Sequence, residues 1–270
     1  MSHQMDLSFL DRPEILETIF PVVYSPFSLL GYLDTPSSDF PEYTIEVEDG
    51  IKISCGFWTS GKECPSILYF HGNGETVPSH NWIAPFYNQI GLNLFVADYR
   101  GYGSSDGKPT ISNMLGDTHA IFRGFKEVIR GEGFKNSLFL MGRSLGSMSA
   151  IELAFNYQDE IQGLIIESGA ANNFRRLWNY FGVTEKEAIF SEESLFLNKV
   201  KIKQVHKPTL IIHGEYDEII SVEEGKELYQ LSGAKEKRIL IIPGAGHNDI
   251  LMAQGLYFDT IEEFIKANSK

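Results

Sequence analysis

The feature that most constrains the fold is a series of short, uninterrupted apolar runs, each bounded by glycine, proline or charged residues. These runs lie at 66–70, 92–97, 137–141, 164–166, 209–212 and 238–242. Runs of this length are typical of strands in a parallel sheet that is buried on both faces. The segments between them place apolar residues at helical spacing, most clearly at 111–130, 222–231 and 250–265. This alternation predicts an α/β protein whose sheet is doubly wound and mostly parallel, with helices on both faces.

Two further strands precede this series. Residues 43–48 alternate between apolar and polar side chains, Asp49 and Gly50 form a tight-turn pair, and a second strand follows at 51–58. With this hairpin, the expected sheet has eight strands. Because no repeat or long polar linker divides the chain, we expect a single domain over residues 1–270, with an irregular N-terminal extension over 1–42.

In a sheet of this kind, chemistry is expected at the carboxyl ends of the strands. The pentad G-R-S-L-G at 142–146 directly follows the run at 137–141 and precedes a helical pattern at 147–157. Its glycines permit a sharp turn that exposes the Ser144 hydroxyl at a helix N-terminus, as in a nucleophile elbow. We therefore predict that Ser144 is a nucleophile and that the Leu145 N–H stabilises an oxyanion. The alternative is an ordinary turn in which Ser144 caps the helix.

A second glycine-containing loop, H-G-N-G at 71–74, follows the run at 66–70. A backbone N–H in this loop can face the same oxyanion, and the position in the loop favours Asn73 as the donor. His71 has the residue type of a catalytic base. A histidine at this place is instead expected to fix the loop through hydrogen bonds.

Two more strand ends offer the remaining groups of a Ser-His-Asp triad. Asp217 lies just past the run at 209–212 and is the candidate for the acid that orients the base. His247 lies in a glycine-containing loop after the run at 238–242, and an imidazole there can take a proton and return it near neutral pH. The competing carboxylates are Glu167, Glu215, Glu218 and Asp249.

The order Ser144, Asp217, His247 is that of α/β-hydrolases and differs from the orders in the two other large serine protease folds. The stretch D-Y-R-G-Y-G-S-S-D-G at 98–107 and the segments 211–217 and 244–248 resemble one branch of the α/β-hydrolase superfamily. That branch includes abhydrolase-domain protein depalmitoylases and serine-aminopeptidase-like hydrolases. The resemblance implies an α/β-hydrolase fold and a Ser-His-Asp hydrolase that acts on an ester or thioester without a cofactor. It also supports Asn73 as the second oxyanion donor.

In this fold, an insertion at residues 169–207 lies over the nucleophile. The insertion is rich in aromatic residues, so we expect a small helical lid that forms an apolar acyl pocket. The substrate-binding candidates are Phe174, Trp178 and Phe181. The alternative is that each of these aromatic side chains only packs the lid onto the body of the domain.

The net charge of −13 repels polyanions and argues against nucleic acid as a partner. The most apolar early segment, 19–33, is interrupted by prolines and is shorter than a membrane span, so no integral membrane segment is expected. Cys55 and Cys64 form neither a disulfide framework nor a metal-binding set, and no signal-peptide pattern opens the chain. We expect a cytoplasmic protein without a metal ion, whose partner is a small-molecule or acylated substrate.

The expected activity is that of a serine hydrolase that cleaves carboxylic ester or thioester bonds through an acyl-enzyme intermediate. A serine peptidase acting on short peptides would use the same triad. An acyltransferase would use an alcohol in place of water. A non-catalytic scaffold on the same fold is the alternative from a different functional class.

Overall fold

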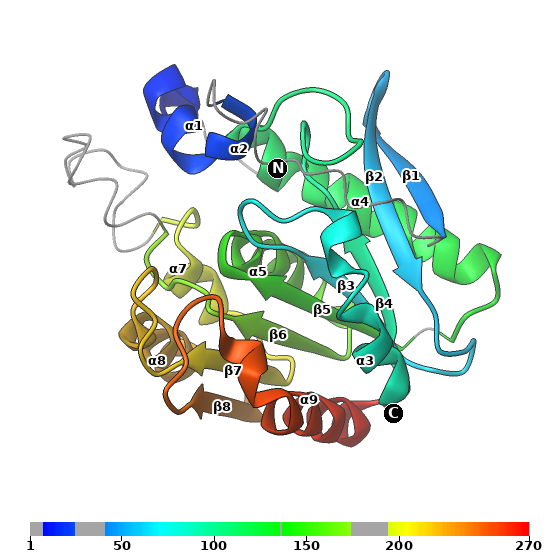
Figure 1. Ribbon diagram of the computed structural model, residues 1–270, viewed down its shortest axis with the longest axis vertical. Coiled ribbons are helices and arrows are strands. Elements are labelled where there is room, and N and C mark those ends of the chain that lie inside the picture. Colours follow the sequence, from blue (N-terminus) through cyan, green and yellow to red (C-terminus); the bar gives the residue numbers. More distant parts are fainter. Residues whose placement is uncertain (1–7, 25–40, 136, 174–193, 270) are drawn as a thin grey trace.

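The computed structural model describes residues 8–24, 41–135, 137–173 and 194–269, which are drawn in colour in Figure 1. Within these residues, eight strands form one sheet in the order β1-β2-β4-β3-β5-β6-β7-β8. β2 runs antiparallel to both β1 and β4, and the other neighbouring strands are parallel. The eight-stranded, mostly parallel sheet predicted from the sequence is therefore confirmed.

The strands are β1 Glu42–Glu48, β2 Ile51–Trp58, β3 Ser66–Phe70, β4 Asn93–Ala97, β5 Leu138–Arg143, β6 Gly163–Glu167, β7 Thr209–Gly214 and β8 Lys237–Ile242. The described α-helices are α1 Pro13–Ile19, α2 Pro21–Tyr24, α3 Ala84–Gln89, α4 Ile111–Gly131, α5 Ser147–Tyr157, α7 Asn198–Ile202, α8 Val222–Leu231 and α9 Gln254–Asn268. Short 3₁₀ turns include η4 Ser144–Gly146 and η7 Ile250–Ala253. In the described part of the chain, no helix combines the length and apolarity needed to cross a bilayer.

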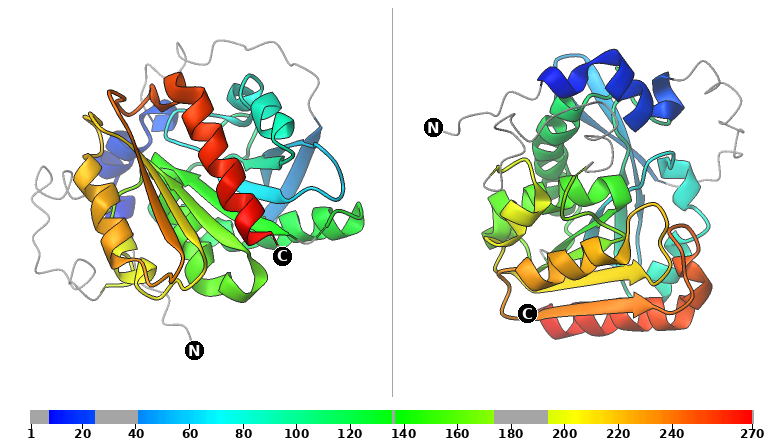
Figure 2. Two further views of the ribbon diagram at one scale, coloured as in Figure 1. Left: turned by 90° about the horizontal axis from the view of Figure 1, so that it is seen from below. Right: turned by 90° about the vertical axis from the view of Figure 1, so that its left-hand side faces the viewer.

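Helices cover both faces of the sheet. Successive side chains along a strand therefore enter two separate apolar cores, one on each face. Along β3, Leu68 and Phe70 belong to a core that includes residues of α1, α4, α5, α7 and α8. Ile67 and Tyr69 point the other way, into a core with residues of α3 and α9. Figure 2 shows α1 and α2 at the opposite side of the molecule from α9. A strand buried at every residue, as β3 is, requires such a layer on each side.

Most predicted elements lie within a few residues of the observed ones. α5 and α8 coincide with the expected helices at 147–157 and 222–231, whereas the pattern at 250–265 divides into η7 and α9. The prediction that the N-terminal extension is irregular is wrong over part of its length, because α1 and α2 lie there. Pro13 occupies the first turn of α1, where its missing N–H is not needed, and Ile15, Leu16 and Ile19 form a buried apolar stripe.

Of the insertion predicted to be a lid, the structure describes residues 169–173 and 194–207. α7 lies in the second of these parts and contacts α5 and α8. Phe174, Trp178 and Phe181, the predicted substrate-binding residues, lie outside the described residues.

Candidate active site

Ser144 lies in the turn between β5 and α5, and β5 is flanked by β3 and β6 inside the sheet (Figure 1). Its φ of 50° is a conformation that costs a non-glycine residue about 1–3 kcal/mol and that clusters at functional sites. Both flanking glycines are sterically required. A Cβ on Gly142 would lie 2.3 Å from the Gly146 carbonyl oxygen, and a Cβ on Gly146 would lie 2.1 Å from the Phe70 carbonyl oxygen. The turn can therefore pack tightly against the end of β3.

A chain of hydrogen bonds joins Ser144, His247 and Asp217. Ser144 Oγ lies 3.0 Å from His247 Nε2, and His247 Nδ1 lies 2.7 Å from Asp217 Oδ2. Because an ionised carboxylate only accepts hydrogen bonds, Nδ1 carries the ring proton and Nε2 is left to accept from the serine hydroxyl. The structure thus brings together three side chains that the sequence places after β5, β8 and β7.

Donors on both oxygens hold the Asp217 carboxylate in place. Oδ1 accepts from the backbone N–H groups of Ile219 at 3.0 Å and Ile220 at 2.7 Å, and Oδ2 lies 3.2 Å from His213 Nε2. Burial by itself raises the pKa of Asp217, but hydrogen bonds from His213, His247 and Ile220 outweigh burial and lower that pKa well below its usual value. The carboxylate therefore stays ionised at neutral pH, where it can stabilise an imidazolium.

Three of the competing carboxylates bind other groups. Glu167 lies 3.0 Å from Arg143 Nε and accepts from the Tyr257 hydroxyl at 2.6 Å. Glu215 and Asp249 each accept from a backbone N–H of the loop that precedes His247. The geometry therefore favours Asp217 over these three as the partner of the histidine.

The two predicted oxyanion donors lie on different segments. Leu145 follows Ser144 in η4, and Asn73 lies in the loop after β3. Among the described residues, neither of their backbone N–H groups donates to another backbone group. The Asn73 side chain is anchored on both sides: Nδ2 donates to the Ile19 carbonyl at 2.6 Å, and Oδ1 accepts from the Tyr102 hydroxyl at 2.6 Å. These bonds fix the loop while the Asn73 N–H stays available.

His71, at the start of the same loop, is fully buried and pairs with Asp98, whose Oδ1 lies 3.1 Å from His71 Nε2. Its carbonyl oxygen accepts from the Tyr99 hydroxyl at 2.7 Å. Burial lowers the pKa of His71, but the hydrogen bond and charge of Asp98 outweigh burial and raise it. His71 therefore fixes the loop through hydrogen bonds, as its position in the sequence indicates.

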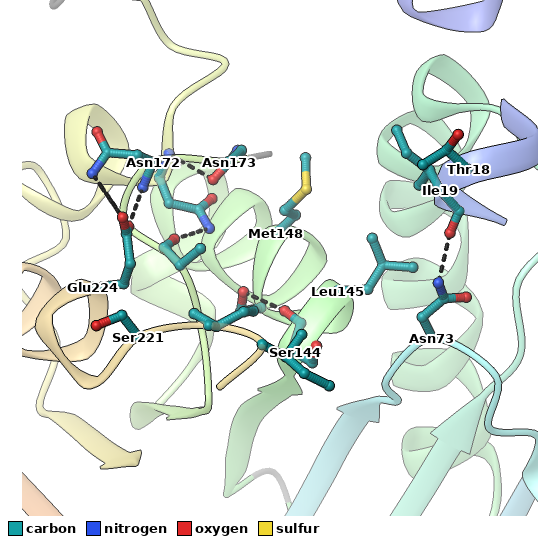
Figure 3. A pocket seen from close by; sticks show the side chains of 15 residues that line it. Thr18, Ile19, Asn73, Ser144, Leu145, Met148, Asn172, Asn173, Ser221 and Glu224 are labelled. Carbon is teal, nitrogen blue, oxygen red and sulfur yellow. Dashed lines mark hydrogen bonds between the residues drawn. The ribbon is translucent and has the colours of Figure 1, made fainter. Parts of the chain in front are cut away.

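A cavity of about 360 Å³ opens beside Ser144 (Figure 3). Proteins bind small molecules in pockets of roughly 300–1,000 Å³, so this one suits a small group. Its apolar lining includes Ile19, Leu145, Met148, Ile219 and Ile220, and its polar lining includes Asn172, Asn173, Asn198 and Glu224. Figure 3 shows Ile19 on the opposite side of the cavity from Asn172 and Glu224, with Ser144 between the two sides.

Sequence reasoning missed several residues of this cavity. Ile19 belongs to the extension that was expected to be irregular, although the spacing of Ile15, Leu16 and Ile19 was a usable helical signal. Asn172 donates its backbone N–H to Glu224 at 2.8 Å across a long stretch of chain. No local pattern in the sequence marks that pair.

Comparison with known proteins shows to which family the chain belongs. The family described as serine aminopeptidase, S33, matches residues 61–182. The human alpha/beta hydrolase domain-containing protein 17B is 30% identical over 223 residues, which cover 80% of this chain and 72% of that protein. A relative with this identity and coverage shows that the chain belongs to the same family, the α/β-hydrolases.

Solved structures show the same fold. The esterase Pf2001 of Pyrococcus furiosus has a TM-score of 0.69 and 20% identity, covering 87% of this chain and 94% of its own. A soluble variant of the monoglyceride lipase of Saccharomyces cerevisiae has a TM-score of 0.64 and 19% identity, covering 88% of this chain and 99% of its own. From the relative, the fold and the shape of the site together, we conclude that the chain is a hydrolase of the α/β-hydrolase superfamily.

Proposed function

We propose that this hydrolase is a serine esterase or thioesterase, which cleaves its substrate through an acyl-enzyme intermediate. The observation that carries the proposal is the hydrogen-bonded chain from Ser144 through His247 to Asp217. This series of hydrogen bonds ends at Ser144, which lies in a strained turn beside a cavity. An acyl group in the cavity can reach the serine hydroxyl. The same arrangement in other folds performs acyl transfer.

In the proposed reaction, Ser144 Oγ attacks the acyl carbonyl while His247 Nε2 takes its proton. Asp217 stabilises the imidazolium that forms. The Leu145 and Asn73 N–H groups donate to the oxyanion of the tetrahedral intermediate. His247 then protonates the leaving alcohol or thiol, and afterwards it activates the water that releases the acyl group from Ser144.

The names of two structurally similar proteins support an ester substrate, and the size of the cavity supports a small acyl or alcohol group. The cavity is small and has an apolar side formed by Ile19, Leu145 and Met148. Two of the structurally similar proteins are named as an esterase and a lipase, and their fold is shared by this chain. We therefore expect short p-nitrophenyl esters to be cleaved faster than long ones.

The first test is labelling with a fluorophosphonate probe. We expect the wild type to be labelled and Ser144→Ala not to be, because the probe reacts with an activated serine. Ser149→Ala is the matched control, since Ser149 is a buried serine of α5 whose hydroxyl has no partner among the described residues, and it should be labelled like the wild type. Hydrolysis of p-nitrophenyl esters from acetate to palmitate then measures the chain-length preference. A wild type without labelling would favour a non-catalytic scaffold.

A serine peptidase acting on short peptides is the second candidate, favoured by the description of the family that matches residues 61–182. The same triad cleaves amides, so the site geometry alone does not separate the two activities. The measurement is the ratio of kcat/KM for a short p-nitrophenyl ester to that for aminoacyl p-nitroanilides. A higher kcat/KM for the anilides than for the ester would favour the peptidase activity over the proposed esterase activity.

A further inference from the structure

Arg143, the residue before Ser144, is largely buried and contacts three separate segments. Its Nε lies 3.0 Å from Glu167 Oε1 at the end of β6, and its Nη1 contacts Glu75 Oε1 in the loop after β3. Its Nη2 donates to the His247 carbonyl at 3.0 Å and to Asn248 Oδ1 at 2.9 Å. One guanidinium therefore joins the nucleophile turn to the oxyanion loop, to β6 and to the histidine loop.

Glu75 extends the contact into the oxyanion loop. Its Oε2 accepts from the Gly72 N–H at 2.9 Å, and Gly72 directly precedes Asn73. The glycine makes room for the guanidinium, because a Cβ at position 72 would lie 2.5 Å from Arg143 Nη1. A shift of Arg143 is therefore passed through Glu75 to the backbone that presents the Asn73 N–H.

The two bonds from Nη2 hold the other loop. Asp217 orients the ring of His247, but the backbone of His247 is held by Arg143 through the carbonyl oxygen. A planar guanidinium has donors in fixed directions and can serve all these acceptors at once. A lysine ammonium carries the same charge on a single nitrogen and cannot span them.

We propose that Arg143 is a positioning residue for the hydrolytic reaction: it sets the placement of the oxyanion loop and the histidine loop relative to Ser144. The proposal rests on the serine-hydrolase function proposed above. Arg143 is absent from the lining of the cavity in the described residues, so its loss should affect kcat rather than KM. A misplacement of about 1 Å in such a site costs roughly 10²-fold in rate.

The test is Arg143→Lys, which keeps a positive charge near Glu75 and Glu167 and so avoids leaving both carboxylates unpaired. Active sites are titrated to completion with a fluorophosphonate, and kcat for p-nitrophenyl acetate is expressed per titrated site. We expect kcat per site to fall by roughly 10- to 100-fold while KM stays within about twofold. Titration removes any unfolded fraction from the comparison, so a purely structural role would leave kcat per site unchanged.

Arg100→Lys is the matched control. The Arg100 side chain is 13% exposed, as is that of Arg143, and it also binds two carboxylates, those of Asp117 and Glu48. Arg100 makes neither of the loop contacts described for Arg143, so Arg100→Lys should keep full kcat per titrated site. Equal losses in the two variants would mean that Arg143 is only a structural ion-pair partner.

A double-mutant cycle with Asn248→Ala tests the contact to the histidine loop. If Nη2 acts through Asn248, the alanine should lower kcat less in Arg143→Lys than in the wild type. If the fluorophosphonate does not label the wild type, the proposed serine-hydrolase function itself is overturned. A labelled wild type together with full kcat per site in Arg143→Lys would overturn the positioning role alone.

Discussion

At the scale of single residues, the second histidine beside Asp217 has a definable task. His213 Nε2 lies 2.8 Å from the Ile220 carbonyl oxygen and 3.2 Å from Asp217 Oδ2. Both neighbours are acceptors, so Nε2 carries the proton. Among the described residues, the buried Nδ1 has no hydrogen-bond partner. His213 therefore donates to the carboxylate and restricts its rotation.

His213→Leu is expected to lower kcat for p-nitrophenyl acetate by roughly tenfold. A hydrogen bond to a charged group contributes about 1.5–3 kcal/mol. A tenfold loss of rate corresponds to an increase of about 1.4 kcal/mol in the activation free energy, so it requires only part of that contribution. His213→Gln keeps an amide donor and should retain most of the rate. Steady-state kinetics per titrated active site is the measurement. Equal rates for the leucine variant and the wild type would contradict the role of His213.

The side chains that meet at Ser144 could be predicted because each is marked by its own stretch of chain. Ser144, Asp217 and His247 each follow a parallel strand and lie near glycines, so the topology of a parallel sheet brings them to one edge. Arg143 and His213 could not be assigned in this way. Their roles depend on contacts with Glu75, His247 and Asp217, which folding alone brings near. The positioning roles of Arg143 and His213 stay predictions.

At the scale of elements, α1 forms one wall of the cavity. Ile19 lines the cavity, and its carbonyl oxygen accepts from Asn73 Nδ2. The next residue, Phe20, packs edge to face against Tyr102, with ring centroids 6.5 Å apart. A helix of seven residues is too short to be stable alone, so these contacts hold it. The N-terminal segment is thus placed to influence which substrates fit.

Ile19→Ala is expected to shift the preferred p-nitrophenyl ester towards longer acyl chains, because it enlarges the cavity. Ile15→Ala is the control: Ile15 is also a buried isoleucine of α1 but is not among the cavity-lining residues. Both variants remove similar apolar volume from the core, at a cost of about 2–5 kcal/mol. The ratio of kcat/KM for octanoate to acetate is the measurement. The same ratio in both variants would argue against α1 as a specificity wall.

The strands and the long helices could be predicted and the short helices could not, for a physical reason. A strand such as β5 is buried on both faces, and a helix such as α4 shows several turns of apolar spacing, so each carries its own pattern. α1, α3 and α7 span only seven, six and five residues, so each shows at most two turns of apolar spacing. They form because they dock onto a surface built by distant residues, and the sequence contains no local sign of that surface.

At the scale of the whole molecule, an ion cluster ties three helices together on one face of the sheet. Glu152 of α5 lies 3.4 Å from His119 Nε2 of α4 and contacts Lys201 Nζ of α7. Burial raises the pKa of Glu152, but His119 and Lys201 outweigh burial and lower the pKa from 4.5 to about 2. The Glu152 carboxyl therefore binds a proton less readily in the folded protein than in the unfolded chain. The resulting stability is fully present above about pH 5 and is lost as the pH falls towards 2.

Glu152→Gln is expected to lower the free energy of unfolding at pH 7 by about 3 kcal/mol and to flatten its decrease between pH 5 and pH 2. Lys201 is itself buried, so Glu152→Gln combined with Lys201→Met separates loss of the pair from the cost of an unpaired ammonium. Glu263→Gln is the control, because Glu263 pairs with Arg238 on the exposed surface, where an ion pair contributes little. Urea unfolding across this pH range is the measurement. If the acid dependence of Glu152→Gln matches that of the wild type, other carboxylates set the acid limit and the three-helix cluster does not.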